Sequence, residues 1–378
     1  MSLKDRCAIV GLGYTVQGKV PGRSGASFYV EASKNAIADA GLNVQDIDGI
    51  IIQPCPTDPR VSAFSLAQDL GLNLRYGTDQ QLHGASSCAI IQHAVMAVDA
   101  GLCDYCLCAF ADTSRSASPA AGIVYQRAAS TDAAYGMFGV AAGYAMIAHR
   151  YMHEYGVTSR QFGAVAVTFR KHASLNPIAQ MREPITIEDH QNSRWVVEPL
   201  HLLDCCLVSD GGRAIIVTSV ERARSLKQPP VYIMGMGQGH PFSDILQRQE
   251  LMLTGAVESG KTAFAMAGIT PADVDVCAIY DSFSFVVLMQ LEDLGFCGKG
   301  EGGAFAEEGR IALGGQLPTN TSGGLLSEVY IQGWVGPHEA VRQLRGDCGE
   351  RQVPGAEIAL VTSSGGVLST HATLILRR

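Results

Sequence analysis

The chain has 378 residues, of which 47% are apolar and 17% charged, and its net charge is −8. This length and composition fit a globular enzyme of two or three domains and exclude a disordered chain. The acidic balance argues against a nucleic-acid partner, and no run approaches the ~18 apolar residues that a membrane span needs. The early apolar run, residues 7–12, is too short for a signal peptide, so we expect a cytoplasmic protein with no membrane partner.

A strand, a helix and a second strand follow one another near the start of the chain. Residues 7–10 and residues 49–53 are short apolar runs that predict strands. Between them, an alanine-rich helix within residues 31–48 is ended by Gly41, because glycine adopts a positive φ at low cost. Together these segments predict a βαβ unit, whose two strands run in the same direction.

The same unit recurs in the second part of the chain. Residues 258–275 repeat the pattern of residues 31–48, with Glu, Lys, three Ala, Gly and two Asp at the same offsets. Predicted strands at residues 231–234 and 276–280 flank this repeat, and Gly268 ends its helix. Two copies predict an α/β protein with two similar halves and parallel-dominated sheets that are covered on both faces.

The remaining residues divide around this repeat. Residues 113–204 follow neither half's pattern and contain two helical stretches, 144–154 and 160–173, which indicates a loop domain inserted into the first half. Pro229 and Pro230 mark the boundary between the halves. The predicted boundaries are 1–112 plus 205–222 for the first half, 113–204 for the loop domain and 228–378 for the second half.

Eleven cysteines are present, many of them within apolar runs. Cys103 and Cys106 form one CxxC pair, but no second pair exists to complete a zinc site. We therefore expect buried, reduced thiols and no bound metal.

Four segments resemble, in order along the chain, motifs of the sterol-carrier-protein type of thiolase. They are residues 171–180, 203–212, 280–284 and 320–327. The resemblance spans nearly the whole chain. It implies the thiolase fold, in which two similar βαβ-based halves form layers in the order α-β-α-β-α and a loop domain is inserted.

The departures from the thiolase pattern lie at its catalytic positions. Gly84 stands where the nucleophilic cysteine belongs, and Cys88, one helical turn further on, is expected to pack in the core. Tyr330 takes the place of the catalytic histidine, and Tyr280 replaces the histidine that opens the His-Asp-Cys-Phe-Ser motif. Residues 360–366 contain no thiol or imidazole that could act as a general base.

This combination resembles the thiolase-like aldolases of bacterial steroid side-chain degradation. The resemblance implies a retro-aldol cleavage of a β-hydroxyacyl-CoA, a steroid side-chain CoA thioester, to a ketone or aldehyde plus acetyl-CoA or propionyl-CoA. It also implies that Tyr280 and Tyr330 are the catalytic pair, that no cofactor is needed besides the CoA thioester substrate, and that a small OB-fold and zinc-ribbon protein is a partner in acyl-CoA binding. The edge strand of the first half is expected to pair in a homodimer.

A retro-aldol cleavage needs a base for the β-hydroxyl proton, donors for the enolate oxygen and an acid for the α-carbon. It needs no covalent attachment to cysteine, so the glycine at position 84 is no obstacle and leaves room for a bulky fragment. His83, beside it, is a third catalytic candidate. The candidate substrate contacts are Gly84, Asp281, Gly324, Gly365, Gly366, Lys171 and His240.

Each candidate also has a purely structural interpretation. The glycine pairs 323–324 and 365–366 could present backbone N–H groups to the enolate oxygen or simply form tight turns. Tyr280 could end a strand with its hydroxyl bonded in the core. Lys171, with its neighbours His172 and Arg182, could meet the CoA phosphates or belong to a solvated face.

Two other functions compete with the aldolase. An unconventional thiolase or acyltransferase could use Cys88 as its nucleophile, and iodoacetamide would then inactivate it. In a non-catalytic acyl-CoA or lipid-binding subunit, we would expect unrelated residues at the former catalytic positions. Two tyrosines at matched positions and the intact run at residues 320–324 argue against that decay.

Overall fold

The computed structural model describes residues 2–117, 134–137, 139–242, 245 and 248–378. The strands of the first half are β1 (Cys7–Tyr14), β2 (Gly49–Ile52), β3 (Tyr76–Asp79), β4 (Tyr105–Thr113) and β7 (Asp210–Ser219). Those of the second half are β8 (Val231–Gly239), β9 (Val276–Ile279), β10 (Ile358–Gly365) and β11 (Thr370–Arg377). Within the described residues these nine strands form one sheet, in the order β3-β2-β4-β7-β1-β8-β11-β10-β9.

This order places the two halves edge to edge with the same internal arrangement. The strands β1-β7-β4-β2 of the first half correspond to β8-β11-β10-β9 of the second. The halves join where Ala8 and Ile9 of β1 pair antiparallel with Tyr232 and Val231 of β8. The repeated βαβ unit therefore organises the whole sheet, as the sequence predicts.

The prediction of parallel-dominated sheets is wrong. Three of the eight neighbouring pairs in the large sheet are parallel, namely β2 with β3, β2 with β4, and β9 with β10, and the other five are antiparallel. The strands of each βαβ unit do run in the same direction. However, β7 lies between β1 and β4, and β11 lies between β8 and β10. Both run in the opposite direction to their neighbours, so most neighbouring pairs are antiparallel.

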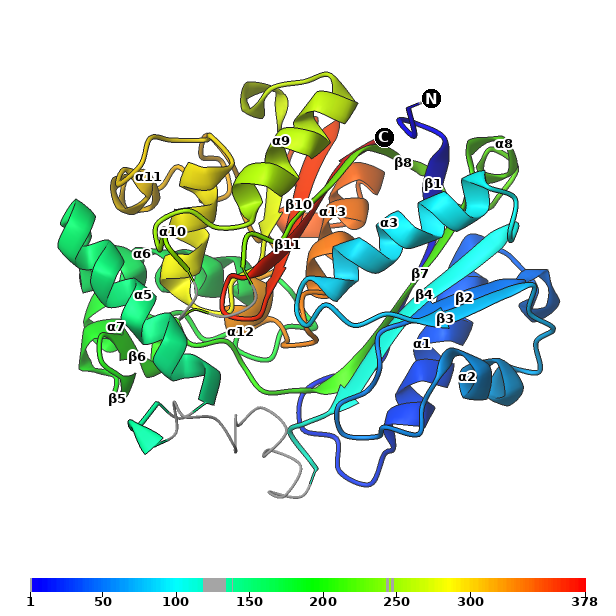
Figure 1. Cartoon of the computed structure of the whole chain (residues 1–378), viewed down its shortest axis with the longest axis horizontal. Coiled ribbons are helices and arrows are strands. Elements are labelled where there is room, and N and C mark those ends of the chain that lie inside the picture. Colours follow the sequence, from blue (N-terminus) through cyan, green and yellow to red (C-terminus); the bar gives the residue numbers. More distant parts are fainter. Residues whose placement is uncertain (1, 118–133, 138, 243–244, 246–247) are drawn as a thin grey trace.

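The helices cover and separate the two halves in layers, as Figure 1 shows. Helices α1 (Gly25–Ala40) and α2 (Ala63–Leu70) cover the outer face of the first half. Helices α3 (Ser86–Asp99) and α13 (Val335–Arg345) lie between the two halves, and α9 (Ala256–Ala267) and α10 (Ser284–Asp293) cover the outer face of the second. The α-β-α-β-α arrangement expected from the resemblance is confirmed.

Glycines inside β1 and β8 let the helices pack directly on the strands. The strands were predicted to end at residues 10 and 234, but both continue through glycines. A Cβ on Gly13 would lie closer than 3.0 Å to the backbone of α1, and a Cβ on Gly235 or Gly237 would lie as close to the backbone of α9. Because both halves use this contact, these glycines belong to the strands and not to the loops after them.

Between β4 and β7 the chain forms α5 (Gly139–Tyr155), α6 (Ser159–Ser174) and α7 (Ile187–Asn192), then the hairpin β5 (Trp195–Val197) and β6 (Leu200–His201). The two predicted helical stretches lie within α5 and α6 and are confirmed. Residues 118–133 and 138 of the predicted loop domain lie outside the described residues. Figure 1 shows these helices beside α10 and α11, at the outer end of the second half.

Short elements complete the chain: α8 (Val220–Ala223), α11 (Gly302–Glu307), α12 (Gly324–Ser327), η1 (Val44–Asp46), η3 (Leu202–Asp204), η5 (Pro271–Asp273) and η6 (Gly349–Arg351). All eleven cysteines carry unpaired thiols, eight of them buried. In the described part of the chain, no helix combines the length and the apolar character that crossing a membrane requires.

Candidate active site

Tyr280 lies at the carboxyl end of β9, where the chain turns into α10. Its backbone N–H donates to the Thr362 carbonyl of β10 at 3.1 Å, and its own carbonyl accepts from Nε2 of Gln290 at 2.8 Å. Thr362 and Gln290 are buried, and the Tyr280 side chain is only 5% exposed. The backbone of this tyrosine is therefore held by two independent elements.

Tyr330 comes from the loop between α12 and α13 and is half-buried. Its backbone N–H donates to Oγ of the buried Ser209 at 3.1 Å. The two phenol oxygens of Tyr330 and Tyr280 lie 3.4 Å apart. The structure thus brings together the two tyrosines that the resemblance implies as a pair, although 50 residues separate them in the sequence.

Gly84 lies in the turn before α3 and faces the ring of Tyr280. A Cβ at this position would lie closer than 3.0 Å to the Tyr280 hydroxyl and to the Ser364 carbonyl. A Cβ on Gly333 would lie 2.9 Å from Cδ2 and Cε2 of the same ring and 3.1 Å from the Gly84 carbonyl oxygen. The phenol therefore occupies the space that a side chain at position 84 would need, so the expected room for a bulky fragment is filled by Tyr280, and both glycines lie against its ring.

The turn after β10 closes against the same loop. A Cβ on Gly365 would lie 2.7 Å from the His83 Cβ and 2.9 Å from the Gly84 nitrogen. A Cβ on Gly366 would lie 3.9 Å from Cδ2 of His83. His83 itself is exposed and has a φ of 52°, a left-handed conformation that is unusual for a residue with a side chain. His83, Gly84, Gly365 and the tyrosine pair therefore share one site.

Asp281 and Gly324 have structural roles beside the pair. The buried Asp281 carboxylate accepts from the backbone N–H groups of Leu325 at 2.9 Å and Leu326 at 3.2 Å, at the start of α12. A Cβ on Gly324 would lie closer than 3.0 Å to this carboxylate, so the close approach requires a glycine. Burial raises the pKa of Asp281 to about 7, and the backbone N–H groups oppose that shift.

The glycine pair at residues 323–324 does not offer both N–H groups to a substrate. The Gly323 N–H donates to the Asn320 carbonyl at 2.9 Å, and the Gly324 N–H lies 3.4 Å from Oγ of Ser322. The suggestion that this turn stabilises an enolate oxygen is therefore not supported by the geometry.

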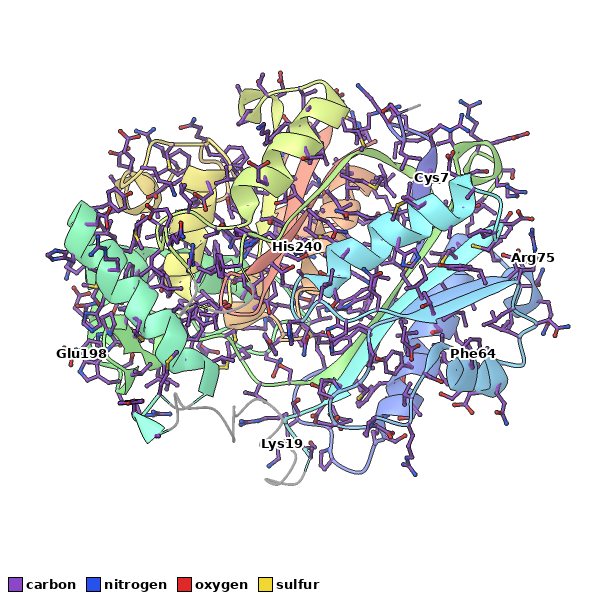
Figure 2. The ribbon with its side chains drawn as sticks, viewed as in Figure 1. Cys7, Lys19, Phe64, Arg75, Glu198 and His240 are labelled. Carbon is purple, nitrogen blue, oxygen red and sulfur yellow. The ribbon has the colours of Figure 1, made fainter. Side chains whose placement is uncertain are left out.

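Lys171 and His240 lie at the surface, at the end of α6 and of β8 respectively. The His240 ring bonds to Oγ1 of Thr370 and, at 3.0 Å, to Oε1 of Gln238. Figure 2 shows His240 near the middle of the view, far from Glu198 at the outer edge of the inserted region. These positions assign no role in substrate binding to Lys171 or His240.

His172, a neighbour of Lys171, is buried and structural. Its Nε2 accepts from the Leu313 N–H at 3.0 Å, so Nδ1 carries the proton and donates to the Asn320 carbonyl at 3.3 Å. Burial lowers the pKa of His172 to about 4. The neutral imidazole joins α6 to the second half and is not available to bind phosphate.

Cys88 does not have the environment of a nucleophile. Its side chain is 0% exposed in the core between the two halves, and burial raises the pKa of its thiol to about 12. Around it, Ser363 near the end of β10 donates to the Ala85 carbonyl at 3.1 Å, directly before the helix α3 that contains Cys88. Cys88 therefore packs in the core, as the sequence predicts, and the alternative of a thiolase based on it loses its support.

Sequence reasoning missed the side chains that connect the two loops around the pair. Gln53, Gln332 and Trp334 form a buried hydrogen-bonded group at this place. No motif or periodicity marks a single glutamine after a strand. Only the fold brings Gln53 to residues that follow it by almost 280 positions.

Several known proteins are similar to this chain over most of its length. Residues 237–378 match the family described as Thiolase C-terminal domain-like. The 17-hydroxy-3-oxo-4-pregnene-20-carboxyl-CoA lyase of Mycobacterium tuberculosis is 43% identical over 97% of this chain and 98% of that lyase. A steroid side-chain-cleaving aldolase of Thermomonospora curvata is 42% identical over 97% of this chain and 96% of its own length.

A solved structure extends the likeness to three dimensions. The Ltp2-ChsH2(DUF35) aldolase superimposes with a TM-score of 0.91 at 41% identity, covering 100% of this chain and 99% of that one. The similarity spans both halves and the inserted region.

Proposed function

This chain belongs to the thiolase superfamily, in the branch of the thiolase-like aldolases, and we propose that it is a carbon–carbon lyase that cleaves a β-hydroxyacyl-CoA. The substrate we propose is a steroid side-chain CoA thioester, because the two similar enzymes carry steroid substrates in their names. The products are a ketone or aldehyde and acetyl-CoA or propionyl-CoA. The reaction uses no cofactor besides the thioester itself.

One observation carries this proposal. The Tyr280 phenol fills the space of a side chain at Gly84 and lies 3.4 Å from the Tyr330 phenol. A covalent acyl-cysteine has no room to form, whereas two phenol oxygens lie 3.4 Å apart, close enough to approach hydrogen-bonding distance with a small movement. A retro-aldol reaction needs only to move one proton, from the β-hydroxyl oxygen to the α-carbon.

The two phenols can carry out that transfer as a relay. Tyr280, acting as its phenolate, accepts the β-hydroxyl proton, the C–O bond becomes a carbonyl, and the electrons of the Cα–Cβ bond pass into the thioester enolate. Tyr330 then gives a proton to the α-carbon. A proton passed from Tyr280 to Tyr330 across their 3.4 Å contact restores both groups, so the cycle consumes no proton and no oxidant.

The test is to follow the release of ketone from a β-hydroxyacyl-CoA without added free CoA. We expect cleavage under these conditions, and we expect iodoacetamide to leave it largely intact because Cys88 is fully buried. A strict requirement for free CoA, or rapid inactivation by iodoacetamide, would instead identify an acyltransferase.

We also propose two kinds of protein partner. The similar Ltp2-ChsH2(DUF35) aldolase has a second component in its name, which supports a small OB-fold and zinc-ribbon partner here. A homodimer is supported by β3, the last strand of the sheet, which within the described part of the chain pairs with β2 alone, and by Phe64, which is 67% exposed near it. Figure 2 places Phe64 and Arg75 together on that side of the molecule. A monomer mass in light scattering at micromolar concentration would contradict the dimer.

A further inference from the structure

Two strained turns lie against the Tyr280 ring. His83 has a φ of 52° and Gln332 a φ of 40°, although neither is a glycine. Each turn presents the next residue, Gly84 or Gly333, to the ring of Tyr280. A left-handed conformation costs a non-glycine residue on the order of 1–3 kcal/mol and persists only where surrounding contacts enforce it.

The Gln53 side chain supplies such contacts to both turns at once. Its Nε2 donates to Oε1 of Gln332 at 2.5 Å and to the His83 carbonyl at 3.1 Å, and its Oε1 accepts from Nε1 of Trp334 at 2.9 Å. Both N–H groups of the amide therefore have acceptors, one in each turn. One planar group thus fixes the turn before α3 relative to the loop that carries Tyr330.

Gln53 is itself rigidly held. It directly follows β2, its N–H donates to the Ala109 carbonyl of β4 at 3.0 Å, and its carbonyl accepts from the Tyr29 hydroxyl. The side chain is 0% exposed. Because the first half holds this residue in place, the side-chain amide can fix the positions of both turns.

We propose that Gln53 is a positioning residue that sets the separation and orientation of the Tyr280 and Tyr330 phenols. It acts through Gly84, which lies against the Tyr280 ring, and through the 330–334 loop, which carries Tyr330 and Gly333. This inference rests on the proposed function for its kinetic readout, whereas its structural readout is independent of that function.

Gln92 of α3 provides a matched control. Its Nε2 donates to the carbonyls of Gly237 at 3.1 Å and Thr373 at 3.0 Å, and its Oε1 accepts from Gln238 at 2.8 Å. It is also buried, at 4% exposed. Gln53→Met and Gln92→Met each remove two fully buried side-chain hydrogen bonds and leave similar volumes; the further, partly buried bonds are two for Gln53, including one to Gln81 at 3.4 Å, and one for Gln92. Only Gln53 joins the two turns.

The experiment measures kcat and KM for retro-aldol cleavage, together with the ¹³Cζ resonances of labelled tyrosines, assigned through Tyr280→Phe and Tyr330→Phe. We expect Gln53→Met to lower kcat by about 10- to 100-fold with little change in KM, since small displacements of reacting groups have effects of that size. It should also shift the Tyr280 and Tyr330 resonances and leave that of Tyr232, in β8, unchanged. Gln92→Met should lose comparable stability with kcat nearly unchanged.

Equal losses of kcat in the two variants, or a Gln53→Met variant with unaltered kcat and tyrosine resonances, would overturn the proposal. In the Tyr280→Phe, Tyr330→Phe double background, a further full loss from Gln53→Met would also overturn it, because a residue acting through the two phenols has little left to affect. If the wild-type protein cleaves no β-hydroxyacyl-CoA, the proposed function fails, and the resonances alone decide the positioning role.

Discussion

The two halves share one architecture but contribute different chemistry to the site. The first half supplies main chain and a buried amide, from the turn at His83 and Gly84 and from Gln53. The second half supplies both phenols, from loops at the ends of its strands and helices. The repeated βαβ unit therefore determines the scaffold, while the loops that leave it determine the chemistry.

The contribution of the second half can be tested most directly on its phenols. We expect Tyr280→Phe and Tyr330→Phe each to lower kcat by roughly 10² to 10⁴, the usual contribution of a general acid or base, with little change in KM. The double variant should be less impaired than the product of the two effects, because both groups serve one proton transfer. Tyr232→Phe, in β8, is the control. Wild-type rates in both single variants would exclude the tyrosine mechanism.

The contribution of the first half is the absence of a side chain at position 84. Gly84→Ala should displace the Tyr280 ring and the 363–365 strand end, since its Cβ has less than 3.0 Å to both. We expect a loss of activity of about 10²-fold and a cost in stability of about 1–3 kcal/mol, as for other overpacked cores. Gly336→Ala, whose Cβ would meet only side-chain atoms at 3.2 Å and beyond, should be tolerated. Full activity in Gly84→Ala would show that the phenol can move aside.

The inserted region is joined to the second half through the neutral His172. This residue makes a pH-dependent contribution to the free energy of unfolding. Since burial lowers the folded-state pKa of His172 to about 4 from 6.5, only the unfolded chain binds this proton between those values, and stability falls as the pH falls through that window. His172→Gln should remove this dependence and make the slope shallower by up to about 1.4 kcal/mol per pH unit.

The pH dependence of His172→Gln must be compared with that of the wild-type protein. The pKa of Asp281 is raised to about 7, and this shift changes the free energy of unfolding in the opposite direction between pH 4 and 7. A folded state that takes up a proton there gains stability as the pH falls, and this contribution cancels between the two proteins. Urea unfolding at several pH values gives both slopes. Identical slopes would mean that His172 is not the buried neutral group described above.

The smallest effect is expected at Cys88, the thiol of the first half that lies nearest to the site in the sequence. Cys88→Ala should change kcat less than about threefold and cost only a modest packing penalty, because the buried thiol contacts no reacting group. A loss above about a thousandfold with a normal fold would revive the thiolase mechanism and reverse the contrast between the halves.

Local sequence patterns were enough to predict the repeated unit, its helices and their ends. Gly41 and Gly268 end α1 and α9 in the left-handed conformation that the pattern predicts, with φ of 73° and 69°. The sequence also located Tyr280 and Tyr330, through motifs whose order along the chain needs no coordinates. These features depend on residues close together in the sequence, so local patterns carry them.

The tertiary structure alone decided the strand order and the geometry of the site. Nothing local in β7 or β11 indicates that each inserts between the strands of its βαβ unit, because strand pairing is a contact between distant segments. The same holds for Gly84, whose lack of a side chain matters only because Tyr280 packs against it, and for Gln53, whose amide reaches two distant turns. Such contacts form between residues that only the folded chain brings within a few ångströms, where close packing leaves no space for a second side chain.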